Sequence, residues 1–205
     1  MSTLPDHDLQ SAVTAEFLAL ADLLDGLTEA GWDSASLCAG WRVREVVAHM
    51  SMPARYSMSE FQAELQKCDF DFTRLSNTVA SRDAALPTSV LIGNLRDDVM
   101  HRWIPPGGGQ TGALNHVVIH GLDITVPLGV ERRSPDETMR AVLDDLTSGG
   151  THAHFGFDID GLHLRATDMN WSYGSGTPVV GTAQDLALLV CGRDLPEGRI
   201  QRPDG

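Results

Sequence analysis

Two histidines four residues apart are the first candidates for chemistry in this chain. His116 and His120 lie in the apolar stretch GALNHVVIHGLDITVPLG, which predicts a largely buried helix. Four residues of α-helix turn through about 400°, so both imidazoles would share one face, with Cβ atoms about 5–6 Å apart. That spacing allows two ring nitrogens to bind one metal ion at roughly 2.0–2.1 Å. Two buried histidines bonded to carbonyl groups or water satisfy the same spacing, and for an isolated pair this is the commoner arrangement.

A third histidine strengthens the metal interpretation. His49 ends the apolar stripe of VREVVAHMSM, where Val46 and Val47 are predicted to face the core. If this helix packs against the helix of the first pair, three imidazoles can surround one ion. The fourth position is then open to water or substrate, which is typical of a catalytic rather than a structural site.

Other polar groups near these histidines are weighed in the same way. Asp123, three residues after His120, could accept the outward N–H of a ligand histidine, or could equally cap or solvate the helix. Cys38 could be a low-pKa thiol, but a small buried residue is the commoner role. His152 and His154 lack a third donor, and we interpret them as part of a linker.

The elements that would position these side chains are amphipathic helices. The first is predicted from Leu9, with apolar residues spaced by three or four as far as Leu27 and with Gly31 as its stop. Apolar spacing, prolines and glycines predict further helices near residues 41–52, 59–67, 75–84, 87–99, 111–128 and 135–148. In the helix that follows Pro87, the inward residues would be Val90, Leu91, Leu95 and Val99.

The pattern changes after residue 149. Leu162, Leu164 and Ala166 alternate with polar residues, which predicts a half-buried strand that Trp171–Tyr173 could pair with. Gly174–Pro178 is predicted to be a turn, and Thr182–Cys191 a short helix. We therefore expect a mainly α fold: a four-helix bundle over residues 1–149 and a small α+β domain over residues 150–205.

Composition excludes several classes of protein. The 205 residues carry 15 Lys+Arg against 28 Asp+Glu, a formal net charge of −13, which disfavours nucleic acid and anionic lipid as partners. Three cysteines without CxxC spacing argue against a disulfide framework and a thiolate zinc cluster. With no signal-peptide pattern or membrane-length apolar run, we expect a cytoplasmic protein.

Three groups of residues resemble a known family. LCAGWRVREVVAH (residues 37–49) is similar to the second-helix signature of DinB-like bundles and, more narrowly, of the mycothiol-dependent maleylpyruvate isomerase family. HxxxHGLDI (116–124), followed by PLG (127–129), resembles the family's metal-binding helix. RATD (165–168), Trp171, GxAxDL (181–186) and CGR (191–193) resemble its small C-terminal domain. The resemblance spans about residues 9–193.

The resemblance implies a DinB-like four-helix bundle that holds a divalent metal, usually zinc, and uses a low-molecular-weight thiol as cosubstrate. His49, His116 and His120 match the three ligand positions. The maleylpyruvate isomerases have a glutamate at the position of His116, so the three-histidine set is more similar to the thiol transferases. Arg193 matches an arginine that the family ties to activity, which makes it the candidate catalytic residue. A helix C-terminal arginine that complements the dipole is the alternative.

From these observations we expect a zinc-dependent enzyme that activates a mycothiol-type thiol for transfer or isomerisation of a small electrophile. Its partners would be that electrophile and the thiol, with no nucleic acid or membrane, and it would be a monomer or homodimer. A non-catalytic bundle that binds a metal or small ligand, and a metal-dependent hydrolase, remain the alternatives.

Overall fold

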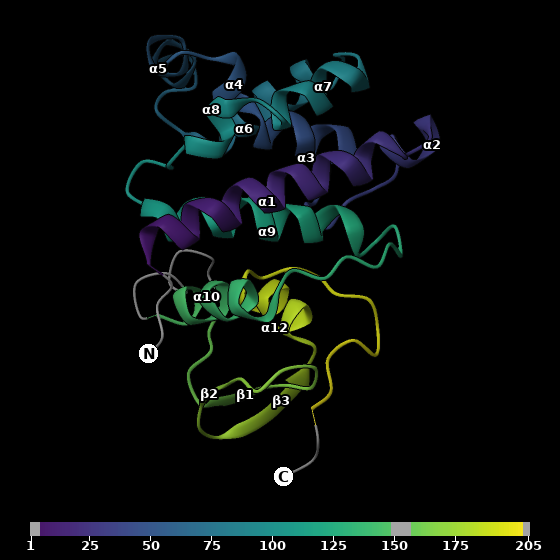
Figure 1. Ribbon diagram of the computed structural model, residues 1–205, viewed down its shortest axis with the longest axis vertical. Coiled ribbons are helices and arrows are strands. Elements are labelled where there is room, and N and C mark those ends of the chain that lie inside the picture. Colours follow the sequence, from purple (N-terminus) through teal and green to yellow (C-terminus); the bar gives the residue numbers. More distant parts are fainter. Residues whose placement is uncertain (1–4, 149–156, 203–205) are drawn as a thin grey trace.

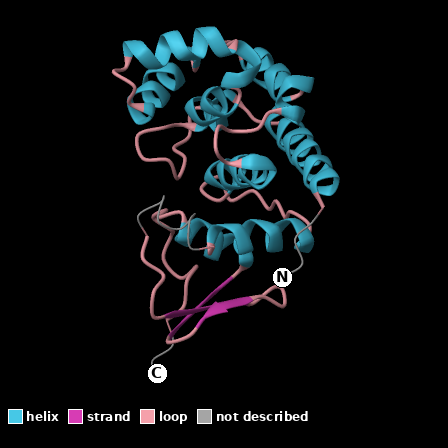
Figure 2. Cartoon of the chain, turned by 90° about the vertical axis from the view of Figure 1, so that its left-hand side faces the viewer, coloured by secondary structure: helices cyan, strands magenta, loops and turns pink. Residues whose placement is uncertain are grey.

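The computed structural model describes residues 5–148 and 157–202. The predicted domain boundary at residues 149–150 and the His152/His154 pair lie outside these described residues. The described part is mainly helical, with a small three-stranded sheet at the C-terminal end (Figures 1 and 2). The predicted fold class, a helical bundle with a small α+β part, is confirmed.

The helices before the sheet follow the predicted apolar segments, except for the two four-residue helices α2 and α4, which were not predicted. They are α1 (Asp6–Asp25), α2 (Glu29–Trp32), α3 (Val43–Met50), α4 (Met52–Arg55), α5 (Met58–Lys67), α6 (Phe72–Asp83), α7 (Thr88–Leu95), α8 (Asp98–Arg102), α9 (Gly109–Thr125) and α10 (Asp136–Leu146). Helix α1 lies alongside α9, and α3 packs against α6, α7 and α9 (Figure 1). The two helices that carry the histidines, α3 and α9, are therefore neighbours.

The core explains why the long helices pack this way. The predicted stripe of α1 is buried through Leu9, Val13, Phe17, Leu20 and Leu24. Helix α9 is buried on most sides, as its all-round apolar sequence predicts. Among the described residues, no helix is both long and apolar enough to cross a lipid bilayer.

Two helix predictions are corrected by capping residues. The predicted helix 87–99 is two helices, because the Asp97 side chain accepts a hydrogen bond from the Val99 backbone N–H (2.8 Å) and starts α8. Val90 and Val99, predicted to face inward, are exposed. Val99 lies beyond this break, whereas Val90 lies in α7 next to the buried Leu91, about 100° away around the helix. The first helix ends at Asp25, and Gly31 lies within α2.

The C-terminal part is a sheet covered by helix. Strands β1 (Leu162–Ala166), β2 (Ser172–Gly174) and β3 (Thr177–Gly181) lie in the order β2-β1-β3, and α12 (Ala183–Val190) packs against α10 and the sheet. The predicted pairing of the first two strands is confirmed as antiparallel. The predicted turn is too long, because Thr177 and Pro178 begin β3, which pairs in parallel with β1. Proline is tolerated there because β3 is an edge strand.

Candidate metal centre and active site

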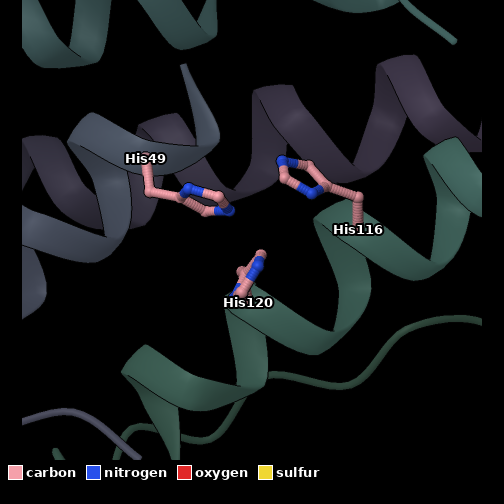
Figure 3. Close-up of side chains that lie close together, drawn as sticks. All are labelled: His49, His116 and His120. Carbon is pink, nitrogen blue, oxygen red and sulfur yellow. The ribbon is translucent and has the colours of Figure 1, made fainter. Parts of the chain in front are cut away.

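The three predicted histidines meet at one point in the structure. His49 extends from α3 and His116 and His120 extend from α9, with ring centroids 5.1 Å (His49–His120), 5.5 Å (His49–His116) and 5.0 Å (His116–His120) apart (Figure 3). One nitrogen from each ring lies within 4.8 Å of the others. We call these three residues the histidine triad. The helix packing thus brings His49 next to His116 and His120, which lie 67 and 71 positions later in the sequence.

For His120 and His116, a hydrogen-bond partner determines which ring nitrogen keeps an available lone pair. His120 Nδ1 lies 2.9 Å from Asp123 Oδ2, and because an ionised carboxylate only accepts, Nδ1 carries the proton and Nε2 keeps its lone pair. His116 Nε2 lies 3.4 Å from the Met50 carbonyl oxygen, a long hydrogen bond that leaves Nδ1 as the lone-pair nitrogen. The buried Nδ1 of His49 has no hydrogen-bond partner within the described part of the chain.

Burial keeps two of the imidazoles neutral. Removal from water, followed by the neighbouring His120, lowers the pKa of His116 to about 3. Burial, followed by His120 and His116, lowers the pKa of His49 well below its ordinary value. A neutral imidazole is the form that binds a metal ion, so these rings are ready to act as ligands near neutral pH.

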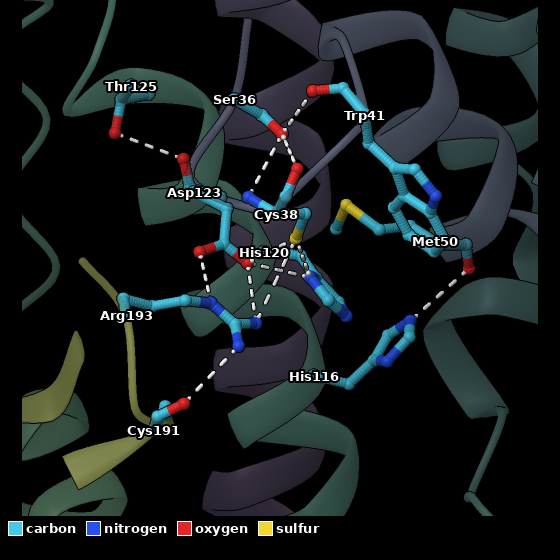
Figure 4. Close-up of polar contacts among 11 residues, drawn as sticks. Ser36, Cys38, Trp41, Met50, His116, His120, Asp123, Thr125, Cys191 and Arg193 are labelled. Carbon is cyan, nitrogen blue, oxygen red and sulfur yellow. Dashed lines mark hydrogen bonds and ion pairs between the residues drawn. The ribbon is translucent and has the colours of Figure 1, made fainter. Parts of the chain in front are cut away.

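Asp123 connects the triad to the C-terminal part of the chain. Its fully buried carboxylate accepts hydrogen bonds from Arg193 Nε (2.7 Å to Oδ1) and a terminal Arg193 nitrogen (3.0 Å to Oδ2), as well as from His120 (Figure 4). Burial alone would raise its pKa, but these hydrogen bonds hold the pKa of Asp123 below the usual range. The carboxylate therefore stays charged, and its contact with His120 is the first of the two predicted roles, acceptance of the outward N–H of a candidate ligand histidine.

Arg193 reaches the triad through this carboxylate. Figure 4 places its guanidinium on the side of Asp123 and His120 away from His116. The same guanidinium donates to the Cys191 carbonyl oxygen at the end of α12 (3.3 Å). The predicted contact with a helix C-terminus is thus present together with the contact to Asp123.

Cys38 lies beside Asp123 and His120, a position that the sequence analysis did not predict. Its thiol donates to Asp123 Oδ2 (3.0 Å), and the sulfur lies 3.8 Å from His120 Nδ1. Burial and the Asp123 charge raise the pKa of the Cys38 thiol, so the low-pKa alternative is wrong for this arrangement. Its place in the LCAGWRVREVVAH motif was the available signal.

Among the residues that the structure describes, two groups of donors could hold a metal ion, and they share His120. One is the histidine triad and the other is Cys38, His120 and Asp123. The second would use a carboxylate that already receives hydrogen bonds from Arg193, Cys38 and His120. In the triad, His116 Nδ1 and His120 Nε2 keep lone pairs that accept no hydrogen bond within the described part of the chain. The buried Nδ1 of His49 also has no partner among the described residues. The triad is therefore the better fit to a borderline ion with a preference for imidazole, such as zinc.

The sequence of the N-terminal part matches a known domain. Residues 13–102 match the family description "Mycothiol maleylpyruvate isomerase N-terminal domain". The predicted resemblance to this family is confirmed. The matched segment includes His49, whereas His116, His120 and Arg193 lie beyond it.

Solved structures share the whole fold. The crystal structure of a mycothiol-dependent maleylpyruvate isomerase has a TM-score of 0.67 at 14% identity, covering 99% of this chain and 96% of that one. A histidine-to-alanine mutant of an enzyme with that name has a TM-score of 0.63 at 15% identity, covering 95% and 93%. No functionally curated protein matches this chain in sequence. The maleylpyruvate isomerase-like fold therefore extends over both the bundle and the C-terminal part.

In this maleylpyruvate isomerase-like bundle, the end of α3 that carries His49 is fixed by Arg55. The Arg55 guanidinium donates to the Ala48 carbonyl oxygen (2.6 Å), to Ser51 Oγ (2.7 Å) and to Asp83 Oδ2 (3.1 Å). Ala48 directly precedes His49 in the chain. Arg55 thereby ties the backbone around His49 to α6, which carries Asp83.

We expect Asp83→Asn to destabilise the protein by about 3 kcal/mol at pH 7, because it removes the charge that Arg55, Arg82 and Tyr56 contact. Although burial opposes it, these partners lower the pKa of Asp83 below 3.8. A carboxyl group with a lowered pKa stabilises the fold above its unfolded-state pKa, and this contribution disappears as pH falls through the folded-state value. Urea unfolding at pH 7, 5 and 3 should show a constant difference between wild type and variant above about pH 5 that shrinks below about pH 4. A difference that grows on acidification would contradict this assignment.

Proposed function

We propose that this protein is a metal-dependent enzyme that activates a low-molecular-weight, mycothiol-type thiol and directs it to a small electrophile. The observation that carries the proposal is the convergence of three imidazole nitrogens from two helices within 4.8 Å. Two of the rings are oriented by Asp123 and by the Met50 carbonyl group. The match to the mycothiol maleylpyruvate isomerase N-terminal domain supports a thiol as cosubstrate.

The residues of the triad fit a zinc ion. Ligand nitrogens around a tetrahedral zinc lie roughly 3.3 Å apart when each is about 2.0–2.1 Å from the ion, so the observed separations need only small ring movements. Because imidazole ligands carry no negative charge, an ion held by these three residues would keep its full charge and could take a further ligand. An ion held there would lower the pKa of a bound thiol, so that the thiolate is present at neutral pH.

The surrounding residues have distinct tasks in this proposal. Asp123 keeps the His120 proton at Nδ1 and so directs Nε2 to the centre. Arg193 compensates the buried charge of Asp123, and we assign it a positioning role in the predicted active site. We further propose that residues 1–149 form the metal-binding bundle and that residues 150–205 form the α+β domain that supplies Arg193.

The proposed reaction begins with addition of the thiol to the electrophile and can end in two ways. The thiol releases its proton to solvent, and the sulfur lone pair forms a C–S bond with the electrophilic carbon. If a solvent proton then adds to the neighbouring carbon, the thiol adduct is the product and the enzyme is a transferase. If rotation about the new single bond is followed by C–S cleavage, the electron pair returns to sulfur, the double bond re-forms and the enzyme is a cis–trans isomerase.

The test is thiol consumption with 1-chloro-2,4-dinitrobenzene, in which C–S bond formation expels chloride. Mycothiol, glutathione, cysteine and a reaction without thiol are compared, with protein as purified, after chelator treatment and after zinc is restored. We expect zinc-dependent consumption with at least one thiol, and its loss in His120→Ala. His163→Ala, in β1, is the matched control and should keep wild-type activity.

The outcomes separate this proposal from the two alternatives. Hydrolysis of ester or amide substrates without thiol would favour the metal-dependent hydrolase, which would use water at the open position. Stoichiometric metal without turnover of any substrate, or protein that stays metal-free, would favour the non-catalytic binding bundle.

A further inference from the structure

Three aromatic side chains surround the histidine triad. Trp41 contacts His49 (ring centroids 5.1 Å apart), and the ring of Phe72 meets His49 edge-on at 6.5 Å. Trp103 meets His116 edge-on at 5.0 Å. They come from the loop before α3, from the first turn of α6 and from the residue after α8. We call Trp41, Phe72 and Trp103 the aromatic rim.

The rim lies between the triad and solvent. Phe72 is 55% exposed although its ring contacts an imidazole, and Trp41 and Trp103 are also partly exposed. In contrast, apolar residues of the two helices that carry the imidazoles, such as Val46 in α3 and Val117 in α9, are completely buried. A small molecule that approaches the triad from solvent would therefore pass against the rim rings.

The backbone before Phe72 is strained. Asp69 and Phe70 both adopt left-handed conformations, with φ of 57° and 61°, which cost non-glycine residues roughly 1–2 kcal/mol each. Such strain persists where the surrounding structure enforces it and often accompanies a functional site. Here the chain leaves the strained residues through Asp71, which caps α6, and places Phe72 at the triad.

The charges beside the triad are already paired. Arg55 is bonded to Asp83, and Arg193 is bonded through two nitrogens to Asp123. The overall charge of −13 also opposes the approach of an anion. Apart from an ion held by the triad itself, the side chains that the described structure presents on its solvent side are thus aromatic rather than cationic.

We propose that the electrophile is a molecule with a planar, uncharged aromatic or conjugated body, and that Phe72 and Trp103 select it by stacking. This inference rests on the proposed function, because it takes the triad as the reaction centre. Aromatic rings prefer offset-stacked and edge-to-face partners, and the exposed Phe72 and the partly exposed Trp103 would offer such contacts to a flat ligand. Phe72 and Trp103 would then be specificity-determining residues that take no part in metal binding.

The test compares two probes by isothermal titration calorimetry on chelator-treated protein, because the carboxylates of one probe would otherwise bind an ion held by the triad. 1,3-Dinitrobenzene is planar and uncharged and has no leaving group, whereas fumarate is a conjugated molecule of similar flatness with two negative charges. We expect 1,3-dinitrobenzene to bind at least about 10-fold more tightly than fumarate. Phe72→Ala should weaken its binding by about 10-fold, the size expected for loss of one aromatic contact, and Phe72→Tyr should restore it.

Phe70→Ala is the matched control, because Phe70 is the same residue type two positions earlier and is 72% exposed. It should bind 1,3-dinitrobenzene as wild type does, and both alanine variants should keep wild-type zinc content and unfolding temperature. Tighter binding of fumarate, or equal effects of Phe70→Ala and Phe72→Ala, would overturn the inference while leaving the proposed function intact. Failure of the proposed function would instead appear as loss of zinc-dependent thiol turnover in wild-type protein.

Discussion

Replacing His49 by alanine is expected to weaken zinc binding by more than about 100-fold. His49 supplies one of only three imidazole nitrogens in the triad, and it is the one contributed by α3. Loss of an outer partner of a metal ligand already costs about 10–100-fold in affinity, so loss of a ligand should cost more. The remaining pair, His116 and His120, lies on one helix and cannot close the site from the other side.

Competition with a chromophoric chelator measures this change, and thermal unfolding with and without zinc provides an independent check. A ligand at 100 times its Kd stabilises the native state by about 2.7 kcal/mol, so zinc should raise the unfolding temperature of wild type but not of His49→Ala. His163→Ala, which alters a histidine of the sheet, should behave as wild type in both assays. Equal zinc affinities for wild type and His49→Ala would rule out the triad as the metal site.

Asp123→Asn is expected to lower the free energy of unfolding by about 3–5 kcal/mol and to weaken zinc binding by about 10–100-fold. The substitution keeps the shape of the side chain but removes the charge that pairs with the largely buried Arg193. It also places an amide that can donate where His120 and Cys38 now find an acceptor. One substitution should therefore affect both the attachment of the C-terminal part and the orientation of a triad ring.

Asp185→Asn separates these two effects. Asp185 is also buried and ion-paired, with Arg199 Nε at 2.5 Å, but it lies at the start of α12 within the C-terminal part. The Asp185→Asn substitution should lower the free energy of unfolding by a similar amount, while the zinc affinity stays at the wild-type value. If Asp123→Asn and Asp185→Asn change zinc affinity equally, Asp123 acts on stability alone and its proposed role in orienting His120 is wrong.

Local chemistry was readable from the sequence where it depends on helix geometry. The four-residue spacing of His116 and His120 fixes their common face, because an α-helix turns about 100° per residue whatever surrounds it. The apolar stripe that ends at His49 likewise indicated which way that helix faces. Breaks that depend on a single cap were missed: Asp97 divides the predicted helix 87–99, and its side-chain hydrogen bond leaves no periodic signal.

The tertiary structure alone decided which of these local features meet. Packing of α3 on α9 brings His49 to the pair, and the fold of the C-terminal part brings Arg193 to Asp123 across 70 positions of sequence. The aromatic rim likewise joins three segments that share no motif. Residue type and helical spacing determine what a side chain can do and which way it faces. Contacts between distant segments depend instead on how whole helices bury their apolar surfaces against one another, which no short stretch of sequence encodes.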